Sequence, residues 1–206
     1  MFYKPGEDDH GLPRNPFNAL ITPRPIAWVA TRDADGVSNL APFSFFNGAA
    51  YEPPILSVAF TGAKLGAQQG ERKDTLANIR ETGVFTVNIV PTALKDAMNA
   101  SAAHLGAGES EFAAAGVTAA ACETIACDRV AESPASFECR LIEVVRLPNT
   151  GPGENTTIFG QVVGVHISED VLTDGFVDPT IYKPLARMGY LDYASIETVF
   201  TLKRPD

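Results

Sequence analysis

The stretch PRPIAWVATRDADGVSNLAPFSFFNGAAYEPP, residues 23–54, decides the expected fold. Residues 26–32 are rich in Ile, Trp and Val, and residues 37–47 form a second apolar run, so each predicts a β-strand. Asp33-Ala34-Asp35-Gly36 lies between the two runs and predicts a hairpin turn, because Gly36 is able to adopt a positive φ. The chain is therefore expected to be organised around an antiparallel hairpin.

The second run of this hairpin is irregular. Pro42 lies in its middle and cannot donate a ladder hydrogen bond, so it predicts a β-bulge or an edge position. The backbone N–H groups of Phe43, Ser44 and Phe45 are then able to face a ligand, such as a planar heterocycle with several acceptor atoms. A plain edge strand with aromatic core residues explains the same pattern, and both interpretations stay open.

The rest of the chain alternates between further strands and a few helices. Strands are predicted at residues 55–60, 84–90, 136–147, 156–168 and 196–202. One helix is predicted from Lys73 to a stop at Gly83 and another from Thr92 to about His104. Residues 105–135 are predicted to form an alanine- and glycine-rich excursion with only short elements.

This order of elements predicts a fold class. Strands outnumber helices and no repeated βαβ spacing occurs, which favours a mainly β fold. We expect one antiparallel barrel or strongly curved sheet with two or three peripheral α-helices. No internal repeat or linker divides the chain, so residues 1–206 are expected to form a single domain, with residues 1–22 as an N-terminal arm.

Composition excludes several classes of function. The formal net charge of −9 argues against nucleic-acid binding, which needs clustered Lys and Arg. No apolar run reaches the length of a membrane span, and the N-terminus MFYKPGEDDHG lacks the apolar core of a secretion signal. Cys122, Cys127 and Cys139 are odd in number and form no CxxC pair, which favours reduced thiols in a cytoplasmic protein.

Common catalytic motifs are missing from the sequence. It contains no G-x-G-x-x-G, no P-loop and no G-x-S-x-G nucleophile elbow. His10, His104 and His166 lie far apart without metal-ligand spacing, as do the cysteines, so no metal site is expected.

Lys73-Asp74-Thr75 is the strongest local signal for a ligand. A helix start offers unpaired N–H groups and a partial positive charge, which suit a phosphate. Lys73 adds a full charge and Thr75 a hydroxyl donor, and Asn78 follows one turn later on the same side. For the tripeptide alone, an ordinary N-cap by Asp74 is the simpler interpretation.

Two further residues are candidates for a site. His166 follows two glycines in the strand GQVVGVHIS, and glycines allow close approach of another molecule or backbone. Arg187 lies in the irregular segment PLARMGYLDY. A structural histidine and a surface or interface arginine are the simpler interpretations.

Taken together, these stretches resemble the flavin reductase-like family of FMN-binding split barrels. The resemblance rests on residues 23–47, on K-D-T-L-x-N-I followed by TGVFTVNIV, and on SPASFECRL, GQVVGVHI and PLARMGYLDYA. These segments occur in the family's order from about Pro23 to Tyr193. One departure is Arg-Met-Gly-Tyr, where Tyr190 stands in place of the second glycine that relatives often have.

The resemblance implies a homodimeric antiparallel Greek-key split barrel with each flavin near the subunit interface. It implies that the strand from Asn39 to Asn47 contacts the isoalloxazine and ribityl groups, that the helix start surrounds the phosphate, and that His166 is catalytic, near the nicotinamide. The implied cofactor-binding residues are Thr31, Asn39, Leu40, Ala41, Pro42, Phe43, Ser44, Phe45, Asn47, Lys73, Asp74, Thr75, Asn78 and Arg187.

The implied activity is transfer of a hydride from NAD(P)H to flavin. The expected cofactor is FMN rather than FAD, and nothing in the residues separates NADH from NADPH. Some family members supply reduced flavin to a partner monooxygenase, whereas others resemble electron carriers without NAD(P)H activity, and both readings are kept. Since the cofactors carry the chemistry, the protein's task is mainly to position them.

Overall fold

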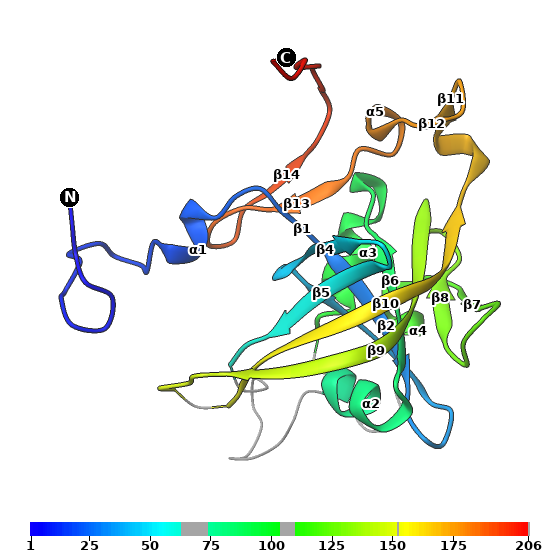
Figure 1. Ribbon diagram of the computed structural model, residues 1–206, viewed down its shortest axis with the longest axis horizontal. Coiled ribbons are helices and arrows are strands. Elements are labelled where there is room, and N and C mark those ends of the chain that lie inside the picture. Colours follow the sequence, from blue (N-terminus) through cyan, green and yellow to red (C-terminus); the bar gives the residue numbers. More distant parts are fainter. Residues whose placement is uncertain (63–73, 104–109, 152, 206) are drawn as a thin grey trace.

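An antiparallel sheet of seven strands dominates the described part of the chain (Figure 1). The computed structural model describes residues 1–62, 74–103, 110–151 and 153–205. The expected mainly β, antiparallel fold class is confirmed. In spatial order the strands are β3 (Ser38–Phe43), β2 (Ala27–Arg32), β6 (Val84–Ile89), β9 (Ala135–Leu147), β10 (Asn155–Ile167), β5 (Pro54–Phe60) and β4 (Phe46–Tyr51).

The two edge strands of this sheet, β3 and β4, are consecutive in the chain. Only Ser44 and Phe45 separate them, so the sheet must curl until its two edges come close together. The prediction of one continuous strand over residues 37–47 was therefore wrong. The chain leaves its pairing with β2 at Phe43 and pairs with β5 from Phe46 onward.

Pro42 occupies an edge position, one of the two outcomes predicted for it. It lies opposite Trp28 on β2, and β3 has no second partner strand in the described structure. The missing N–H therefore leaves no inner ladder position empty. The predicted turn is also present: Gly36 has a φ of 85°, and Asp33 N donates to Val37 O at 3.0 Å.

Three helices pack on the sheet, and they correspond to the expected peripheral helices. The remaining helices are single turns. The packed helices are α2 (Asp74–Thr82), α3 (Lys95–Ala100) and α4 (Glu111–Ala115), and the single turns are α1 (Phe17–Leu20), α5 (Pro179–Tyr182) and the 3₁₀ turns Thr92–Leu94 and Glu169–Val171. Helix α2 ends as predicted at Gly83, which has a φ of 72° and donates to Ile79 O at 2.9 Å.

Two further sequence predictions need correction. The helix expected from Thr92 to about His104 is a 3₁₀ turn followed by α3, which ends at Ala100; His104 lies outside the described residues. No strand forms over residues 196–202. Ile196 N still donates to Pro184 O at 3.2 Å, but the segment then runs away from the sheet, and Phe200 is 81% exposed (Figure 1).

Short strands complete the chain. They form three small sheets outside the main one, and one of them contains the β7–β8 hairpin within the predicted excursion. In the first small sheet, β13 (Leu185–Arg187) lies between β1 (Arg24–Pro25) and β14 (Tyr193–Ser195). In the other two, β7 (Ala119–Ala121) pairs with β8 (Asp128–Val130), and β11 (Leu172–Thr173) pairs with β12 (Phe176–Val177).

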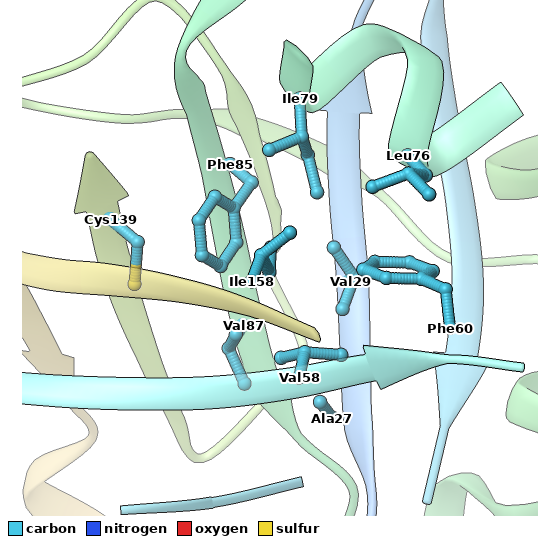
Figure 2. Packing of buried hydrophobic residues seen from close by; sticks show 10 residues of the cluster. All are labelled: Ala27, Val29, Val58, Phe60, Leu76, Ile79, Phe85, Val87, Cys139 and Ile158. Atoms are coloured by element: carbon cyan, nitrogen blue, oxygen red, sulfur yellow. The ribbon is translucent and has the colours of Figure 1, made fainter. Parts of the chain in front are cut away.

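The concave face of the curled sheet encloses one hydrophobic core (Figure 2). Leu76 and Ile79 of α2 cover one end of this core and are fully buried. Phe85 of β6 lies against Gly160 of β10, where a side chain would not fit. The buried members are Ala27, Val29, Val58, Phe60, Leu76, Ile79, Phe85, Val87, Cys139 and Ile158.

The opposite face of β2 and β3 carries a second core, which α3, α4 and β8 cover. Trp28 is fully buried there, and its indole N–H donates to Ser101 Oγ at 2.8 Å. Leu40 faces this core from β3, and Met98 and Phe112 face it from the two helices. Strand β2 is thus buried on both faces, which explains its high apolar content.

The Gly160→Ala variant is expected to lower the free energy of unfolding by about 1–3 kcal/mol, the usual cost of overpacking a filled core. An added Cβ would lie 2.3 Å from Phe85 Cζ and 3.3 Å from Cys139 Cβ. Urea unfolding monitored by circular dichroism measures the change.

The matched control is Gly151→Ala, whose Cβ would contact only Asn149 Oδ1, at 3.8 Å. Adding Phe85→Leu to Gly160→Ala should recover part of the lost stability. An equal loss in the control would show that the packing against Phe85 is not the cause.

Candidate functional site

Four polar side chains meet where α2 begins, next to the β2–β3 hairpin. Asn39 Nδ2 donates to Thr75 Oγ1 at 2.8 Å, and Asn78 Nδ2 donates to Thr31 Oγ1 at 3.1 Å. Thr31 and Thr75 are buried, Asn78 is 9% exposed, and Asn39 is half-buried. The structure thus brings together four of the residues expected around a phosphate.

The donors in this cluster suit an anion. In these contacts the threonine hydroxyl accepts, as it does from Asn39 Nδ2 to Thr31 Oγ1 at 3.5 Å, so each hydroxyl keeps a proton that it can donate elsewhere. The first N–H groups of the nine-residue helix α2 lie at the same place and add a partial positive charge. The same bonds also fasten α2 to the hairpin. Lys73 and the side chain of Asp74 lie outside the described residues.

A cavity of about 250 Å³ lies at the other end of β3. Pro42, Phe43 and Ser44 line it from the strand end, and Arg187 and Tyr193 line it from β13 and β14. Its walls combine apolar side chains with a few polar groups, the usual composition of a small-molecule site. The corner between β3 and β4 therefore borders a hollow rather than packed core.

Arg187 is held firmly beside this cavity. Its guanidinium carbon lies 4.5 Å from the centre of the Tyr193 ring, and one of its nitrogens donates to the carbonyl oxygen of Tyr190. Tyr190 has a φ of 56°, a conformation that costs an L-residue about 1 kcal/mol and favours glycine. Glycine would adopt this conformation without that cost.

The other residues that were expected to contact the flavin from residues 39–47 lie in different surroundings. Leu40 is fully buried in the second core, and Ala41 lies opposite Val29 in the hairpin. The ring of Phe45 lies 5.7 Å from the guanidinium carbon of Arg24. Asn47 is exposed on β4, and its side chain accepts from Gly48 N at 2.9 Å. Of these residues, none lines the cavity.

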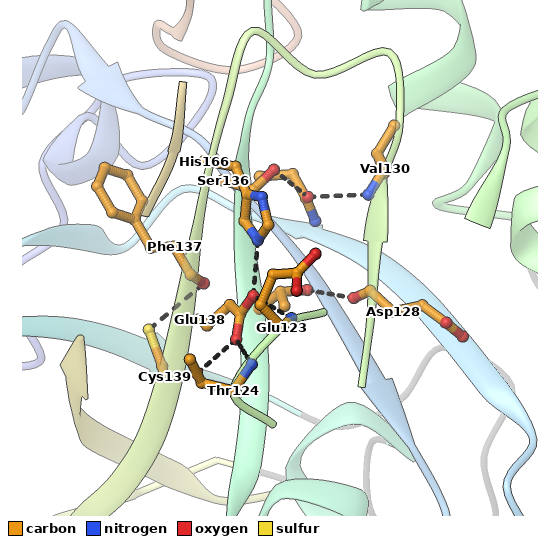
Figure 3. A network of polar contacts seen from close by, with 11 residues as sticks. Glu123, Thr124, Asp128, Val130, Ser136, Phe137, Glu138, Cys139 and His166 are labelled. Atoms are coloured by element: carbon orange, nitrogen blue, oxygen red, sulfur yellow. Dashed lines mark hydrogen bonds and ion pairs between the residues drawn. The ribbon is translucent and has the colours of Figure 1, made fainter. Parts of the chain in front are cut away.

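His166 lies in a different polar network, beneath the β7–β8 hairpin (Figure 3). Its Nε2 is 2.6 Å from Oε1 of Glu138, whose carboxylate is fully buried. Glu123 N and Thr124 N each donate to that carboxylate at 2.7 Å. Gly164, two residues before His166, has a packing role, because a Cβ at this position would lie 3.2 Å from the carboxyl carbon of Glu138.

The carboxylate of Glu138 is strongly stabilised in its charged form. Burial alone would raise its pKa, but hydrogen bonds from Thr124, Glu123 and His166 outweigh burial and lower the pKa to about 2. A fully hydrogen-bonded carboxylate of this kind holds its neighbours in place. It fixes both the orientation of the His166 ring and the loop between β7 and β8.

The structure does not bring His166 together with the strand residues within one chain. Paired residues run across the sheet from Pro42 through Trp28, Asn88 and Ser136 to His166. Four strand spacings of about 4.8 Å separate the two ends of this row, or about 19 Å along the curved sheet. His166 is also absent from the walls of the cavity beside Pro42 and of two other cavities that the described residues form.

Sequence reasoning missed Glu138. Its signal was present: in SPASFECRL a carboxylate stands between Phe137 and Cys139 in a strand, which is an unusual place for an exposed residue. The partners that satisfy it, Glu123 and Thr124, lie in a segment without recognisable strand pattern. No local rule therefore connected the two.

Comparison with known proteins identifies the family. A family model for the flavin reductase like domain matches residues 19–187, most of the chain. The chain belongs to the flavin reductase-like family. An uncharacterized protein from Halalkalibacterium halodurans is 35% identical over 187 residues, which cover 90% of this chain and 87% of that protein.

Two solved structures of similar proteins extend this result. Nitrilotriacetate monooxygenase component B from Bacillus cereus is 32% identical, covers 98% of both chains and superposes with a TM-score of 0.87. The 2-nitrobenzoate 2-nitroreductase NbaA of Pseudomonas fluorescens is 26% identical, with a TM-score of 0.78 over 92% of this chain and 88% of its own. This flavin reductase-like chain has, in its described part, no helix that is long and apolar enough to cross a membrane.

The Glu138→Gln variant is expected to lose up to about 3 kcal/mol of stability at neutral pH. The folded-state pKa lies below the ordinary value of 4.5, so the carboxylate contributes its full stability above pH 4.5 and loses it as the pH falls towards 2. Unfolding free energies of wild type and variant, measured from pH 7 to pH 2, should therefore converge below pH 4.5.

Glu143→Gln serves as the control, since Glu143 lies exposed on the same strand. A constant difference between wild type and Glu138→Gln down to pH 2 would contradict the assigned pKa.

Proposed function

We propose that this protein is an FMN-dependent NAD(P)H:flavin oxidoreductase. One observation carries the proposal: strand β3 links the polar cluster at the start of α2 to the cavity beside Pro42 and Ser44. A flavin mononucleotide needs this arrangement, with a site for its phosphate at one end and a site for its ring at the other. Membership of the flavin reductase-like family supports the same cofactor.

The phosphate end fits the proposed ligand in its chemistry. Thr31, Thr75 and the amides of Asn39 and Asn78 supply hydroxyl and N–H donors, and α2 supplies the positive end of its dipole. Lys73, immediately before α2, is proposed to add the charge that binds the phosphate most strongly. Asp74 is proposed to lie in the same turn.

The spacing along β3 fits the proposed ligand in its length. Asn39 and Phe43 are four residues apart on an extended strand, a distance of about 13 Å at about 3.3 Å per residue. An extended ribityl chain with its phosphate is proposed to follow the strand over this length. The strand backbone from Asn39 to Ser44 would hold it.

The protein residues at the ring end bind, orient and exclude water. Phe43 and Tyr193 supply apolar surface around the cavity, and Ser44 supplies a hydroxyl and an N–H at the corner. The bound flavin would supply the acceptor for a hydride, two electrons and one proton, that leaves the nicotinamide of NAD(P)H. Arg187 is proposed to contact the cofactor. His166 lies far from this corner within one chain, so it is proposed to reach the nicotinamide from the second copy of the homodimer proposed below.

We propose that the reduced flavin serves a partner monooxygenase. The support is the likeness to nitrilotriacetate monooxygenase component B from Bacillus cereus. The runner-up function, an electron carrier, predicts the same flavin site but no reduction by NAD(P)H. Stopped-flow mixing of the flavin-loaded protein with NADH and NADPH separates the two, because only the oxidoreductase loses flavin absorbance.

The Thr75→Val variant is expected to bind FMN about tenfold more weakly, the effect of losing one hydrogen bond to a charged group. Riboflavin, which lacks the phosphate, should bind wild type and variant equally. Fluorescence titration of the apoprotein with each flavin measures both affinities.

Thr173→Val, in the exposed β11–β12 hairpin, is the matched control. Equal weakening of both flavins by Thr75→Val would place the phosphate elsewhere. A protein that binds neither flavin would contradict the proposed function itself.

We also propose that the chain forms a homodimer through the edge strand β4. Gly48, Ala49 and Ala50 carry no charge and are exposed, and Tyr51 is 95% exposed at the end of the strand. Proteins normally protect such an edge with charges, bulky groups or a partner. A second copy covering this edge would lie next to the Ser44 corner and its cavity.

The dimer predicts a sedimentation mass of twice the 21.9 kDa chain. The Ala49→Lys variant should shift the mass towards that of one chain, whereas Val37→Lys, at the exposed β2–β3 turn, should not. A wild-type mass of one chain at micromolar concentration would contradict the homodimer.

A further inference from the structure

A second cavity, of about 390 Å³, adjoins the one beside Pro42 and Ser44. The two hollows share Met98, Arg187 and Tyr193 in their walls. The larger one lies between α3, which contributes Lys95, and the segment that contains β13 and β14. Its size falls in the usual range for small-molecule sites. A ligand that reaches the first cavity can therefore extend into the second.

The walls of this second cavity combine an apolar side with two cationic groups. Leu191, Met98 and Tyr193 form the apolar side, Lys95 and Arg187 supply two positive charges, and Asp96 adds one carboxylate. The charged groups of the wall therefore sum to one positive charge, in a chain whose net charge is −9. This combination suits a ligand with an aromatic or apolar part and an anionic part.

Both cations are available to a ligand. Lys95 Nζ lies 3.2 Å from Asp96 Oδ2, but the two side chains are 57% and 91% exposed, and a pair so exposed is weak. Among the described residues, Arg187 forms no ion pair with a carboxylate. Its guanidinium is held by the Tyr193 ring and the Tyr190 carbonyl, so it is already oriented when a ligand arrives.

A second arginine adds to the positive field. Arg24 lies directly opposite Arg187 in the β1–β13 pair. Arg24 is 8% exposed, and the hydrogen bonds of its guanidinium go to the backbone carbonyls of Asn18, Ile21 and Met188 rather than to carboxylates. Like charges directly opposite one another repel, and an anion bound nearby relieves that repulsion. Burial and the charge of Arg187 both lower the pKa of Arg24, as expected for an uncompensated cation.

We propose that the second cavity binds the phosphate-bearing arm of a reduced nicotinamide dinucleotide, with Lys95 and Arg187 on the pyrophosphate. This rests on the proposed function, in which the first cavity holds the flavin ring. The apolar side formed by Leu191, Met98 and Tyr193 packs against the adenine. Lys95 and Arg187 thus determine the preference for a dinucleotide over a simple dihydronicotinamide.

The test compares Lys95→Gln with wild type in the FMN-loaded full-length protein. The donors are NADH, NADPH and 1-benzyl-1,4-dihydronicotinamide, which carries the same hydride but no phosphate. The variant should raise KM for both dinucleotides about tenfold, leave kcat near its wild-type value, and leave the kinetics with the benzyl compound unchanged. Lys183→Gln, which removes an exposed lysine near the same strands but outside the cavity, should match wild type.

Equal effects of Lys95→Gln on all three donors, or no effect on any, would overturn the proposed pyrophosphate site. Calorimetry with ADP-ribose tests the site without turnover: wild type should bind it, and Lys95→Gln should bind it about tenfold more weakly. Absence of ADP-ribose binding would also overturn the site. If ADP-ribose binds but no donor reduces the flavin, the site stands and the proposed oxidoreductase activity fails.

Discussion

Strands β3 and β4 are the two edges of one seven-stranded sheet, yet two residues join them, and this constraint shapes the whole molecule. A sheet whose edges are tied so closely cannot stay open, so it curls around a single core that α2 covers at one end. The corner at Ser44 and Phe45 cannot pack as tightly as the strands beside it. The hollow of the candidate ring site lies against that corner.

The sequence predicted those parts of the fold that rest on local patterns. The Asp33–Gly36 turn, the stop of α2 at Gly83 and the long strands β9 and β10 follow from turn residues and period-two alternation. The break at Ser44 was missed because the apolar run is continuous across it, and pairing with β5 rather than composition sets the boundary. The apolar residues at 196–202 suggested a strand, but no partner strand lies beside them.

The candidate site, like the fold, could be predicted only in part from the sequence. Thr31, Asn39, Thr75 and Asn78 come from three separate segments. Helix spacing placed Thr75 and Asn78 together, but only resemblance to a family added Thr31 and Asn39 in advance. The structure adds the hydrogen bonds that join all four. Lys95 gave no signal at all, because an exposed lysine on a short helix has no pattern of its own. The role proposed for Lys95 depends on a cavity wall to which β13 and β14 contribute residues from the far end of the chain.

The β7–β8 excursion is attached to the sheet through both its backbone and a few side chains. Glu123 N, Thr124 N and Val130 N donate to side chains of the main sheet, and the carbonyl of Asp128 accepts from Thr86. The Asp128 carboxylate also accepts from Arg32, and the Thr124 hydroxyl donates to Glu138. The alanines of β7 can therefore change without loosening these contacts, whereas Thr124 and Asp128 cannot.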